Sequence, residues 1–329
     1  MSTVSVVIAT YSRAAMVRQA VDAALAQIRA PEEILISDDA SPDQTPAVLE
    51  QLALSNPSVR VIRQTHNTGG VPNWNAALNG ASGDYLAWCS DDDRFLPDHL
   101  QASLAYLEAH PDVGLVHSGF VDAVETEAQV QEIPRPHRFR EPHQVDGRNL
   151  IRYMLRYYDW PFHPSTIVMR RAVWEATGPF NPAYALADTD WFVRAAELFP
   201  VVLLPRHGVL NRRHPGNWSN RIGSARMQHE IFSIVEGAIS RRWPHHCVKP
   251  GLTRALWRAH VRLRLLLTVR ARVRSGHLEA ACAAWNQMLQ GTGRHVPVWV
   301  ENAGAKLIRR LCARREVRFE DARHSVSPL

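Results

Sequence analysis

The sequence predicts an α/β protein whose central sheet is mainly parallel and covered by helices on both faces. Over the first 118 residues, short runs rich in β-branched residues alternate with segments in which apolar residues recur at helical spacing. Polar residues follow directly after several of the expected strands, which is where such sheets bind their ligands. Hydrophobic residues make up 46% of the 329 residues and charged residues 21%, as in an ordinary globular chain.

The expected elements follow one another regularly in this first part. Strands are expected at residues 4–9, 34–36, 59–62, 85–89 and 113–116. Helices are expected at residues 13–28, from Pro46 onward, at 72–78 and at 97–109. In the first helix Val17, Val21 and Ala24 fall on one face, and Pro46 suits the first turn of the second helix.

The rhythm changes after residue 118. Residues 131–147 are rich in Pro, Arg and His and lack periodicity, so we expect a long loop or a lid there. Residues 150–220 mix short elements, and residues 226–312 are expected to be largely helical. Between residues 252 and 275, Arg254, Arg258 and Arg262 form a stripe opposite several leucines, which predicts an amphipathic helix.

Basic residues gather in the last quarter of the chain. Of 38 Lys and Arg and 32 Asp and Glu, residues 241–329 hold 18 basic and 5 acidic ones. An Arg-rich solvated helix face is the commoner explanation of such a bias, and a surface for anionic lipid is the alternative. We expect no nucleic-acid partner, and an oligomer stays open.

The cysteines and the apolar segments indicate the compartment. Four cysteines lie without any C-x-x-C pairing, which favours a reducing compartment over a disulfide scaffold or a thiolate zinc site. The first residues lack the basic region and the apolar length of a secretory signal. No stretch offers about twenty uncharged apolar residues, so we expect a cytoplasmic protein without a membrane span.

Three adjacent aspartates, Asp91, Asp92 and Asp93, follow the strand expected at residues 85–89. Adjacent carboxylates repel, so the cluster is costly unless a cation lies against it. Mg²⁺ or Mn²⁺ would suit these oxygen ligands and could bridge to substrate phosphates. The alternative is an acidic turn that caps the helix expected from residue 97.

A second acidic pair, Asp38 and Asp39, ends another expected strand. Carboxylates at such a place can accept hydrogen bonds from a nucleobase N–H or a ribose hydroxyl. The sequence has no G-x-G-x-x-G after the first strand and no G-x-x-x-x-G-K-[ST], the glycine loops that usually bind phosphate. A diphosphate would therefore be neutralised by a metal ion.

Five stretches occur in a fixed order along the chain: "VSVVIATYSRAAMVRQAVDAAL", "EEILISDDASPDQT", "NTGGVPNWNAALNGASGDYLAWCSDDDRFLP", "GPFNPAYALADTDWFVRAAE" and "RRHPGNWS". In this order and spacing, over residues 4 to about 219, they resemble the motifs of family 2 glycosyltransferases with the GT-A fold. The resemblance implies a Rossmann-like mixed sheet flanked by helices, with a nucleotide-sugar-binding half at 1–118 and an acceptor-binding and catalytic-base half of the same domain at 119–225. The residues beyond it predict a helical C-terminal extension, a basic, mainly helical region at 226–329.

The resemblance implies roles for the residues at matching positions. Thr10, Tyr11 and Asp38 match the positions that hold the base and ribose of the donor, with Asp38 facing a uracil-type N–H. The whole nucleotide-sugar site is expected at Thr10, Tyr11, Arg13, Asp38, Asp39, Asn67, Gly69, Asn75, Asp91 and Asp93. The metal, Mn²⁺ or Mg²⁺, is expected at Asp92, Asp91 and His214. For His214, a loop histidine packed by Trp218 is the alternative.

The catalytic base is expected at Asp188, and Asp190 is the second candidate. The family usually has Glu-Asp where this chain has Ala187-Asp188. Ser90 stands where the first metal-binding aspartate is usual, so the choice of direct ligand between Asp91 and Asp92 stays open. An Arg common before Asn75 is here Trp74. A carboxylate that takes the acceptor proton suffices for inversion without a covalent intermediate.

Trp160 and His163, in "DWPFHPST", are candidates for the acceptor site because aromatic faces stack on sugars, with core packing as the alternative. The expected function is metal-assisted, inverting transfer from a UDP- or dTDP-sugar to a glycan or lipid-linked glycan, in polysaccharide or cell-envelope biosynthesis. The basic C-terminal helices are expected to touch the cytoplasmic face of the membrane peripherally. A Mg²⁺-dependent phosphohydrolase or phosphotransfer domain, and a non-catalytic nucleotide- or glycan-binding module, remain as alternatives.

Overall fold

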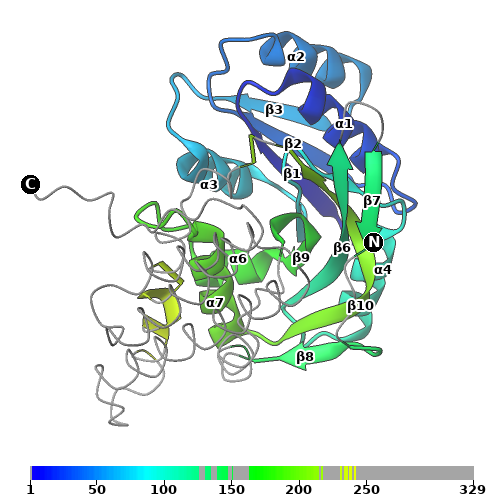
Figure 1. Cartoon of the computed structure of the whole chain (residues 1–329), viewed down its shortest axis with the longest axis vertical. Helices are drawn as coiled ribbons and strands as arrows, with labels where there is room; N and C mark the ends of the chain where they lie inside the picture. Colours follow the sequence, from blue (N-terminus) through cyan, green and yellow to red (C-terminus); the bar gives the residue numbers. More distant parts are fainter. Residues whose placement is uncertain are drawn as a thin grey trace, which may run out of the picture. The chain divides into compact units, whose positions relative to one another are not determined.

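The computed structural model describes residues 2–214 except 126–129, 135–138, 147–149 and 151–162, together with 216, 217 and a few positions between 230 and 241. The chain divides into two compact units, Met1–Arg152 with Trp160–Asn217, and Tyr153–Asp159 with Trp218–Leu329. The first unit contains the sheet and its covering helices (Figure 1). The amphipathic helix expected between residues 252 and 275 lies outside the described residues.

A mixed sheet forms the centre of the first unit, and in the described part of the chain it has 10 strands. They are β1 (Val4–Thr10), β2 (Glu33–Asp38), β3 (Val59–Arg63), β4 (Tyr85–Trp88), β5 (Arg94–Phe95), β6 (Leu115–Glu125), β7 (Val130–Pro134), β8 (His143–Val145), β9 (Ile167–Arg170) and β10 (Val201–Arg213). The order is β3-β2-β1-β4-β9-β6-β10-β5, with β7 beside β6 and β8 beside β10. The first four of these run parallel, whereas β9 is antiparallel to both neighbours. The predicted α/β alternation and the mixed sheet are both confirmed.

Helices cover both faces of this sheet (Figure 1). They are α1 (Ala14–Leu25), α2 (Thr45–Ser55), α3 (Gly70–Gly80), α4 (His99–Ala109), α6 (Arg171–Thr177) and α7 (Ala187–Leu198), with a short 3₁₀ turn η1 at Pro164–Thr166. Gln27, after α1, hydrogen-bonds Leu96 and Leu100 beside α4, and Trp174 of α6 donates to Asn79 of α3. Hence α1, α2 and α4 share one face, and α3, α6 and α7 share the other. Among the described helices, none is long and apolar enough to cross a membrane.

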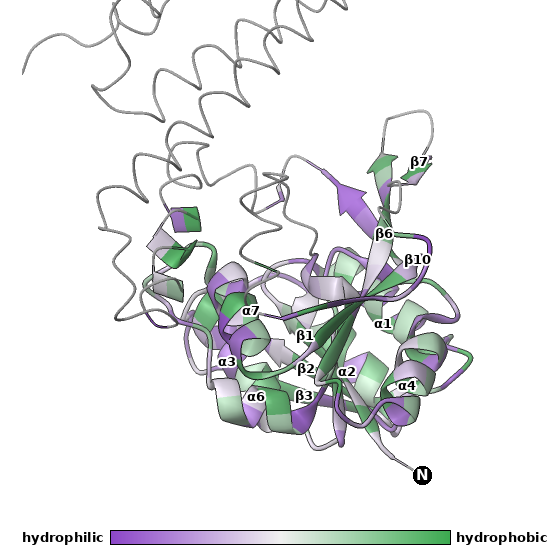
Figure 2. Cartoon of the chain, turned by 90° about the horizontal axis from the view of Figure 1, so that it is seen from below, coloured by the Kyte–Doolittle hydropathy of each residue, from purple (hydrophilic) through white to green (hydrophobic). Residues whose placement is uncertain are grey.

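The core lies along the central strands, because these strands are covered on both sides. All seven residues of β1 are buried, so it reads as a continuous apolar run instead of an alternating one. Val17 and Val21 of α1 pack into the same core as Val6 and Ile8 of β1. Figure 2 shows hydrophobic residues gathered along β1, β2 and β6. Because β1 lies between β2 and β4, its carboxyl end, at Thr10, lies between the carboxyl ends of these two strands.

The expectation of a long loop at residues 131–147 is wrong in part. Val130–Pro134 forms β7, antiparallel to β6, and His143–Val145 forms β8, antiparallel to β10. Residues 131–134 are exposed, so they show no buried stripe that could reveal a strand in the sequence. The backbone pairing offered by the long strands β6 and β10 determines these two strands.

Candidate functional site

The carboxyl ends of three neighbouring strands meet at one place, as the sequence predicted. Thr10 ends β1, and its hydroxyl donates to Asp91 Oδ2, after β4, at 2.7 Å. On the other side, the Asp39 N–H, after β2, donates to the Thr10 carbonyl at 3.1 Å. Ser12 and Ala40, in the turns after β1 and β2, have positive φ angles of 53° and 56°. Such backbone strain is frequent where a binding site is held in shape.

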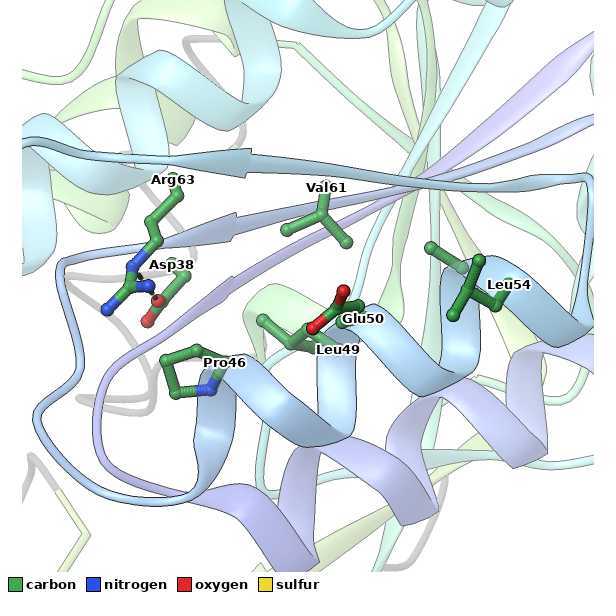
Figure 3. A pocket seen from close by; sticks show the side chains of 8 residues that line it. Asp38, Pro46, Leu49, Glu50, Leu54, Val61 and Arg63 are labelled. Atoms are coloured by element: carbon green, nitrogen blue, oxygen red, sulfur yellow. Dashed lines mark ion pairs between the residues drawn. The ribbon is translucent and has the colours of Figure 1, made fainter.

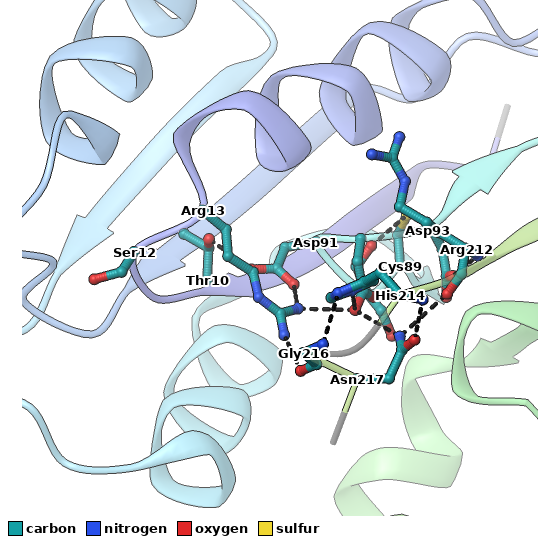
Figure 4. A network of polar contacts seen from close by, with 12 residues as sticks. Thr10, Ser12, Arg13, Cys89, Asp91, Asp93, Arg212, His214, Gly216 and Asn217 are labelled. Carbon is teal, nitrogen blue, oxygen red and sulfur yellow. Dashed lines mark hydrogen bonds and ion pairs between the residues drawn. The ribbon is translucent and has the colours of Figure 1, made fainter. Parts of the chain in front are cut away.

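The three adjacent aspartates have different sets of partners, although Asp91 and Asp92 share Arg13. Figure 4 shows this network of polar contacts. Asp91 binds Thr10 and Arg13, at 2.7 Å each. Asp92 Oδ2 contacts Arg13 at 2.8 Å and His214 Nε2 at 3.1 Å. Asp93 accepts from the Ser165 hydroxyl at 2.5 Å and from the Arg212 N–H at 3.1 Å, beneath the other two.

Burial makes this cluster expensive to ionise. It raises the pKa of Asp91 to about 6, with the charge of Asp92 adding to the effect and Arg13 opposing it. Burial raises the pKa of Asp93 to about 8, again with a contribution from Asp92. The thiol of Cys89, just before the triplet, has a pKa raised well above its usual value for the same reason. The site therefore favours any cation that can approach the carboxylates.

The aspartates and His214 form a donor set that suits a divalent ion. Two carboxylates and an imidazole are ligands that Mn²⁺ accepts. Asp91 Oδ1 and Asp92 Oδ2 already converge on one positive centre, Nη1 of Arg13. Within the described residues, no three acidic, histidine or cysteine side chains are grouped as a ready metal site. The residues fit the ion, but with the Arg13 guanidinium between them they are not yet arranged around one.

Asp38 lies at the end of β2 beside a cavity of about 430 Å³ under α2 (Figure 3). Its Oδ1 accepts hydrogen bonds from the N–H and the hydroxyl of Ser41, at 3.1 and 2.5 Å. Its Oδ2 is buried, has no hydrogen-bond partner, and lies 3.5 Å from Nε of Arg63. The cavity is lined by Asp38, Pro46, Leu49, Glu50, Ala53, Leu54, Val61 and Arg63. Oδ2 of Asp38 thus takes part in an ion pair but accepts no hydrogen bond.

The other residues expected to hold the donor shape the surrounding loops. Asp39 accepts from the N–H groups of Thr68 and Gly69, at 2.7 and 2.8 Å, and thereby fixes the loop before α3. In this loop, Asn67 also accepts from the Gly69 N–H at 3.1 Å, and Gly69 has a φ of 91° that favours glycine. Tyr11 is 44% exposed, so its ring can be reached by a ligand.

Asn75 clamps the segment that leads to α7. Its side-chain amide donates to the Phe180 carbonyl at 3.0 Å and accepts from the Phe180 N–H at 2.8 Å. Phe180 in turn packs against Trp88 of β4, with ring centroids 4.8 Å apart. Asn75 therefore holds the backbone of the segment that precedes α7, the helix of Asp188. The contacts of its side-chain amide are with Phe180 and not with the aspartate triplet.

Asp188 and Asp190 both lie in the first turn of α7 but differ in their surroundings. Asp188 is partly exposed, and its Oδ1 accepts from the Thr189 N–H at 2.7 Å. Burial raises the pKa of Asp188, which strengthens the carboxylate as a base. Asp190 is 5% exposed and pairs with Arg194 at 2.9 Å. Asp188 is thus the carboxylate available to a ligand, and Asp190 is engaged within its own helix.

His163 lies against the aspartate triplet, and the charge of Asp188 also acts on it. Its Nδ1 is 3.5 Å from Asp93 Oδ2. Burial lowers the pKa of His163 to about 4, while the carboxylates of Asp92 and Asp188 act in the opposite direction. The charges of Asp92 and Asp188 therefore both act on one imidazole. Trp160, the other residue expected near the acceptor, lies outside the described residues.

Several residues of the site were missed by the sequence analysis. Ser165, whose hydroxyl also accepts from the Ser90 N–H at 2.9 Å, holds Asp93, and Asn217 lies 3.3 Å from Asp92 Oδ2. Arg63 lies against Asp38. Arg63 ends a strand beside β2, and that position was the signal that could have revealed it. Ser165 carried no comparable signal, because it reaches Asp93 from 72 residues away.

Comparison with known proteins agrees with this picture. The family model for glycosyl transferase family 2 matches residues 5–175. An uncharacterized protein of Mycobacterium tuberculosis strain H37Rv is 31% identical over 224 residues, which cover 65% of this chain and 60% of that relative. The chain thus spans about 60% of the length of that curated relative.

Solved structures are similar in fold. The structure of S. aureus TarS 1-349 in complex with UDP-GlcNAc has a TM-score of 0.60 at 15% identity, covering 97% of this chain and 93% of that one. The mannosyltransferase PcManGT from Pyrobaculum calidifontis, in complex with GDP-Man and Mn²⁺, has a TM-score of 0.55 at 18% identity, covering 96% and 84%. At this level of identity the likeness concerns the fold alone, and the fold is that of GT-A glycosyltransferases.

Proposed function

Because this chain belongs to glycosyl transferase family 2, we propose that it transfers a sugar from a nucleoside diphosphate to a hydroxyl group of a glycan or lipid-linked glycan, with inversion at the sugar carbon. The observation that carries this proposal is the convergence of Asp91 Oδ1 and Asp92 Oδ2 on one positive centre, with the partly exposed carboxylate of Asp188 near enough to influence the same histidine, His163, as Asp92 does. One acidic group can then hold the leaving diphosphate through a cation while the other removes a proton from the acceptor.

In the proposed reaction, Asp188 accepts the proton of the attacking hydroxyl. The acceptor oxygen forms a bond to the anomeric carbon, and the bond from that carbon to the diphosphate oxygen breaks with its electron pair. A divalent ion, held by Asp91, Asp92 and His214, would supply positive charge for the leaving diphosphate. The raised pKa of Asp188 supports the role, because a stronger base transfers the proton more readily.

Oδ2 of Asp38, which accepts no hydrogen bond, favours a uracil or thymine base. Oδ1 is used by Ser41, so Oδ2 alone can receive an N–H from the base. Uracil and thymine offer one such N–H, flanked by carbonyl groups that the nearby Arg63 guanidinium could meet. Guanine presents two neighbouring donors, and cytosine has an acceptor at the same ring position. A UDP- or dTDP-sugar therefore fits better than a GDP- or CDP-sugar.

The two alternative functions have less support. An aspartyl phosphohydrolase would need a nucleophilic aspartate soon after β1, and the chain has Thr10, Tyr11, Ser12 and Arg13 there. Thr10 is engaged with Asp91. A non-catalytic binding module would share the whole donor site, so turnover alone separates it from an enzyme.

Nucleotide binding tests the donor. With Mn²⁺ present, UDP or dTDP should raise the thermal midpoint, because a ligand at a hundred times its Kd stabilises the fold by about 2.7 kcal/mol. CDP and GDP should raise it little. In Asp38→Asn the preference for uracil over cytosine should disappear, because the carboxylate acceptor is lost. Equal shifts with all four nucleotides in the wild-type protein would contradict the assignment of Asp38.

Turnover tests the base. Asp188→Asn should keep the UDP shift but lower the rate of nucleoside diphosphate release about 10²- to 10⁴-fold. Asp112→Asn, a change on an exposed loop, is the matched control and should keep the wild-type rate. If the wild type with Mn²⁺ releases no nucleoside diphosphate from any common UDP- or dTDP-sugar, with or without an acceptor extract, the non-catalytic module is correct.

A further inference from the structure

Arg13 occupies the centre of the aspartate triplet. It directly precedes α1, and its backbone N–H is held by the Thr45 hydroxyl at 3.0 Å. Nη1 lies 2.7 Å from Asp91 Oδ1 and 2.8 Å from Asp92 Oδ2. One nitrogen thus donates to an oxygen of each of two separate carboxylates, and a shared metal ion would draw the two oxygens together in the same way.

The same guanidinium also holds the segment that carries His214. Its Nη2 donates to the Gly216 carbonyl at 3.1 Å. Asp92 Oδ2 is meanwhile contacted by His214 Nε2 and by Asn217 Nδ2, at 3.1 and 3.3 Å (Figure 4). Arg13 and Asp92 together therefore hold His214, Gly216 and Asn217 beside the aspartates.

The charges show why a cation is needed here. The side chains of Asp91 and Asp92 are only 8% and 11% exposed, and unpaired buried carboxylates are strongly unfavourable. The side chain of Arg13 is 25% exposed, so its guanidinium borders on solvent and on any ligand that approaches the aspartates. A divalent ion at the same place would be repelled by the guanidinium, so the two cations must exclude each other.

We propose that Arg13 is an internal cation that takes the place of the divalent ion when no nucleotide is bound, is displaced by that ion, and then pairs with the donor diphosphate. The last part rests on the proposed function. The metal and the nucleotide must then bind cooperatively. If the metal ion binds alone, the displaced guanidinium of Arg13 has no negatively charged group to pair with. If the nucleotide is also bound, its diphosphate provides that negative charge.

Metal binding measured without nucleotide tests the displacement. Mn²⁺ is titrated into the full chain by calorimetry, with free Mn²⁺ followed by electron paramagnetic resonance. Arg13→Gln should bind Mn²⁺ about tenfold more tightly than the wild type, because the competing charge is gone. Arg18→Gln is the matched control, since Arg18 lies on α1, which Arg13 directly precedes, and contacts Gln51 instead of an acidic residue. It should bind Mn²⁺ like the wild type.

Cooperative binding of Mn²⁺ and nucleotide tests whether the displaced Arg13 pairs with the diphosphate. UDP should tighten Mn²⁺ binding strongly in the wild type and about tenfold less in Arg13→Gln. Arg13→Lys keeps a charge but lacks the planar fork, so it should fall between the two and serves if Arg13→Gln unfolds. The inference is overturned if Arg13→Gln binds Mn²⁺ no more tightly than the wild type, or if neither binds it. Failure of UDP to bind the wild type with Mn²⁺ would instead overturn the proposed function and leave the displacement result intact.

Discussion

Close contacts around single residues determine how this sheet can be built. Gly208 interrupts the pairing of β10 with β6, where the register shifts between His207 and Val209. A Cβ atom at this position would lie 2.2 Å from Nδ1 of His99, a buried residue of α4. The strand can approach α4 only because this side chain is absent. His99 and Gly208 therefore form one packing unit.

Gly208→Ala should lower the free energy of unfolding by about 1–3 kcal/mol, because the added methyl overpacks a closed contact. Urea denaturation measures the loss. His99→Ala removes the nearer of two atoms in conflict and leaves Ser118 Oγ, which a Cβ at Gly208 would approach to 2.5 Å. Adding Gly208→Ala to that variant should therefore cost less than it costs in the wild type. Equal losses in the two backgrounds would show that His99 does not cause the conflict.

The buried histidine also makes stability depend on pH. Burial lowers the pKa of His99 to about 3 from 6.5, and the charge of Arg206 adds to this effect. Between these values the unfolded chain binds a proton that the folded chain excludes. The contribution to stability is therefore complete above pH 6.5 and decreases as the pH falls toward 3.

Over this range the free energy of unfolding should fall by up to about 1.4 kcal/mol per pH unit on account of His99. His99→Leu cannot bind the proton, so its stability should fall less steeply between pH 6.5 and 4 than that of the wild type. Urea unfolding at a series of pH values measures both slopes. Parallel curves would contradict the excluded proton.

At the scale of elements, α7 is placed by contacts made at its first two turns. Arg194 pairs with Asp190 and donates to the carbonyls of Thr177 and Pro179, at 2.5 and 2.8 Å. Trp191 donates to the Gly178 carbonyl at 3.1 Å. These bonds join α7 to the end of α6. They therefore position Asp188, although Asp188 itself takes part in none of these bonds.

Arg194→Met should therefore lower kcat while leaving the Kd for UDP unchanged, because the donor residues lie on other elements. Two carbonyls and Asp190 lose their partner, so unfolding should become easier by about 1–3 kcal/mol. Glu175→Gln, on the exposed side of α6, is the control and should stay within about 0.5 kcal/mol of the wild type. An Arg194→Met variant with normal kcat would show that Asp188 is positioned without this anchor.

At the scale of the whole molecule, the most distinctive property is the bias of charge. Residues 241–329 hold 18 Lys and Arg against 5 Asp and Glu, while the remaining residues carry more acidic than basic groups. Such a segment is attracted to an anionic surface over a distance that salt shortens. This is the sequence property behind the expected peripheral contact with the membrane.

The full chain should co-sediment with vesicles that contain phosphatidylserine at about 20 mM salt, and far less at about 300 mM, because the Debye length shortens between these conditions. Zwitterionic vesicles are the control and should bind little at either salt concentration. Absence of binding to the anionic vesicles at low salt would rule out the electrostatic contact.

The sequence by itself determined the order of the elements and the edge at which the site lies. Local apolar spacing identified β1 to β4 and α1 to α4, because those signals come from neighbouring residues and do not depend on the rest of the chain. The rule that parallel strands end at one edge then placed Asp38 and the aspartate triplet together.

The tertiary structure alone decided what each acidic residue contacts. Arg13 reaches Asp91 across 78 residues and Gly216 across 203, and Ser165 reaches Asp93 across 72. The exposed β7 and the short β8 likewise exist only through their pairing with β6 and β10. No local pattern encodes contacts between such distant residues, because each depends on how the completed sheet brings its loops together.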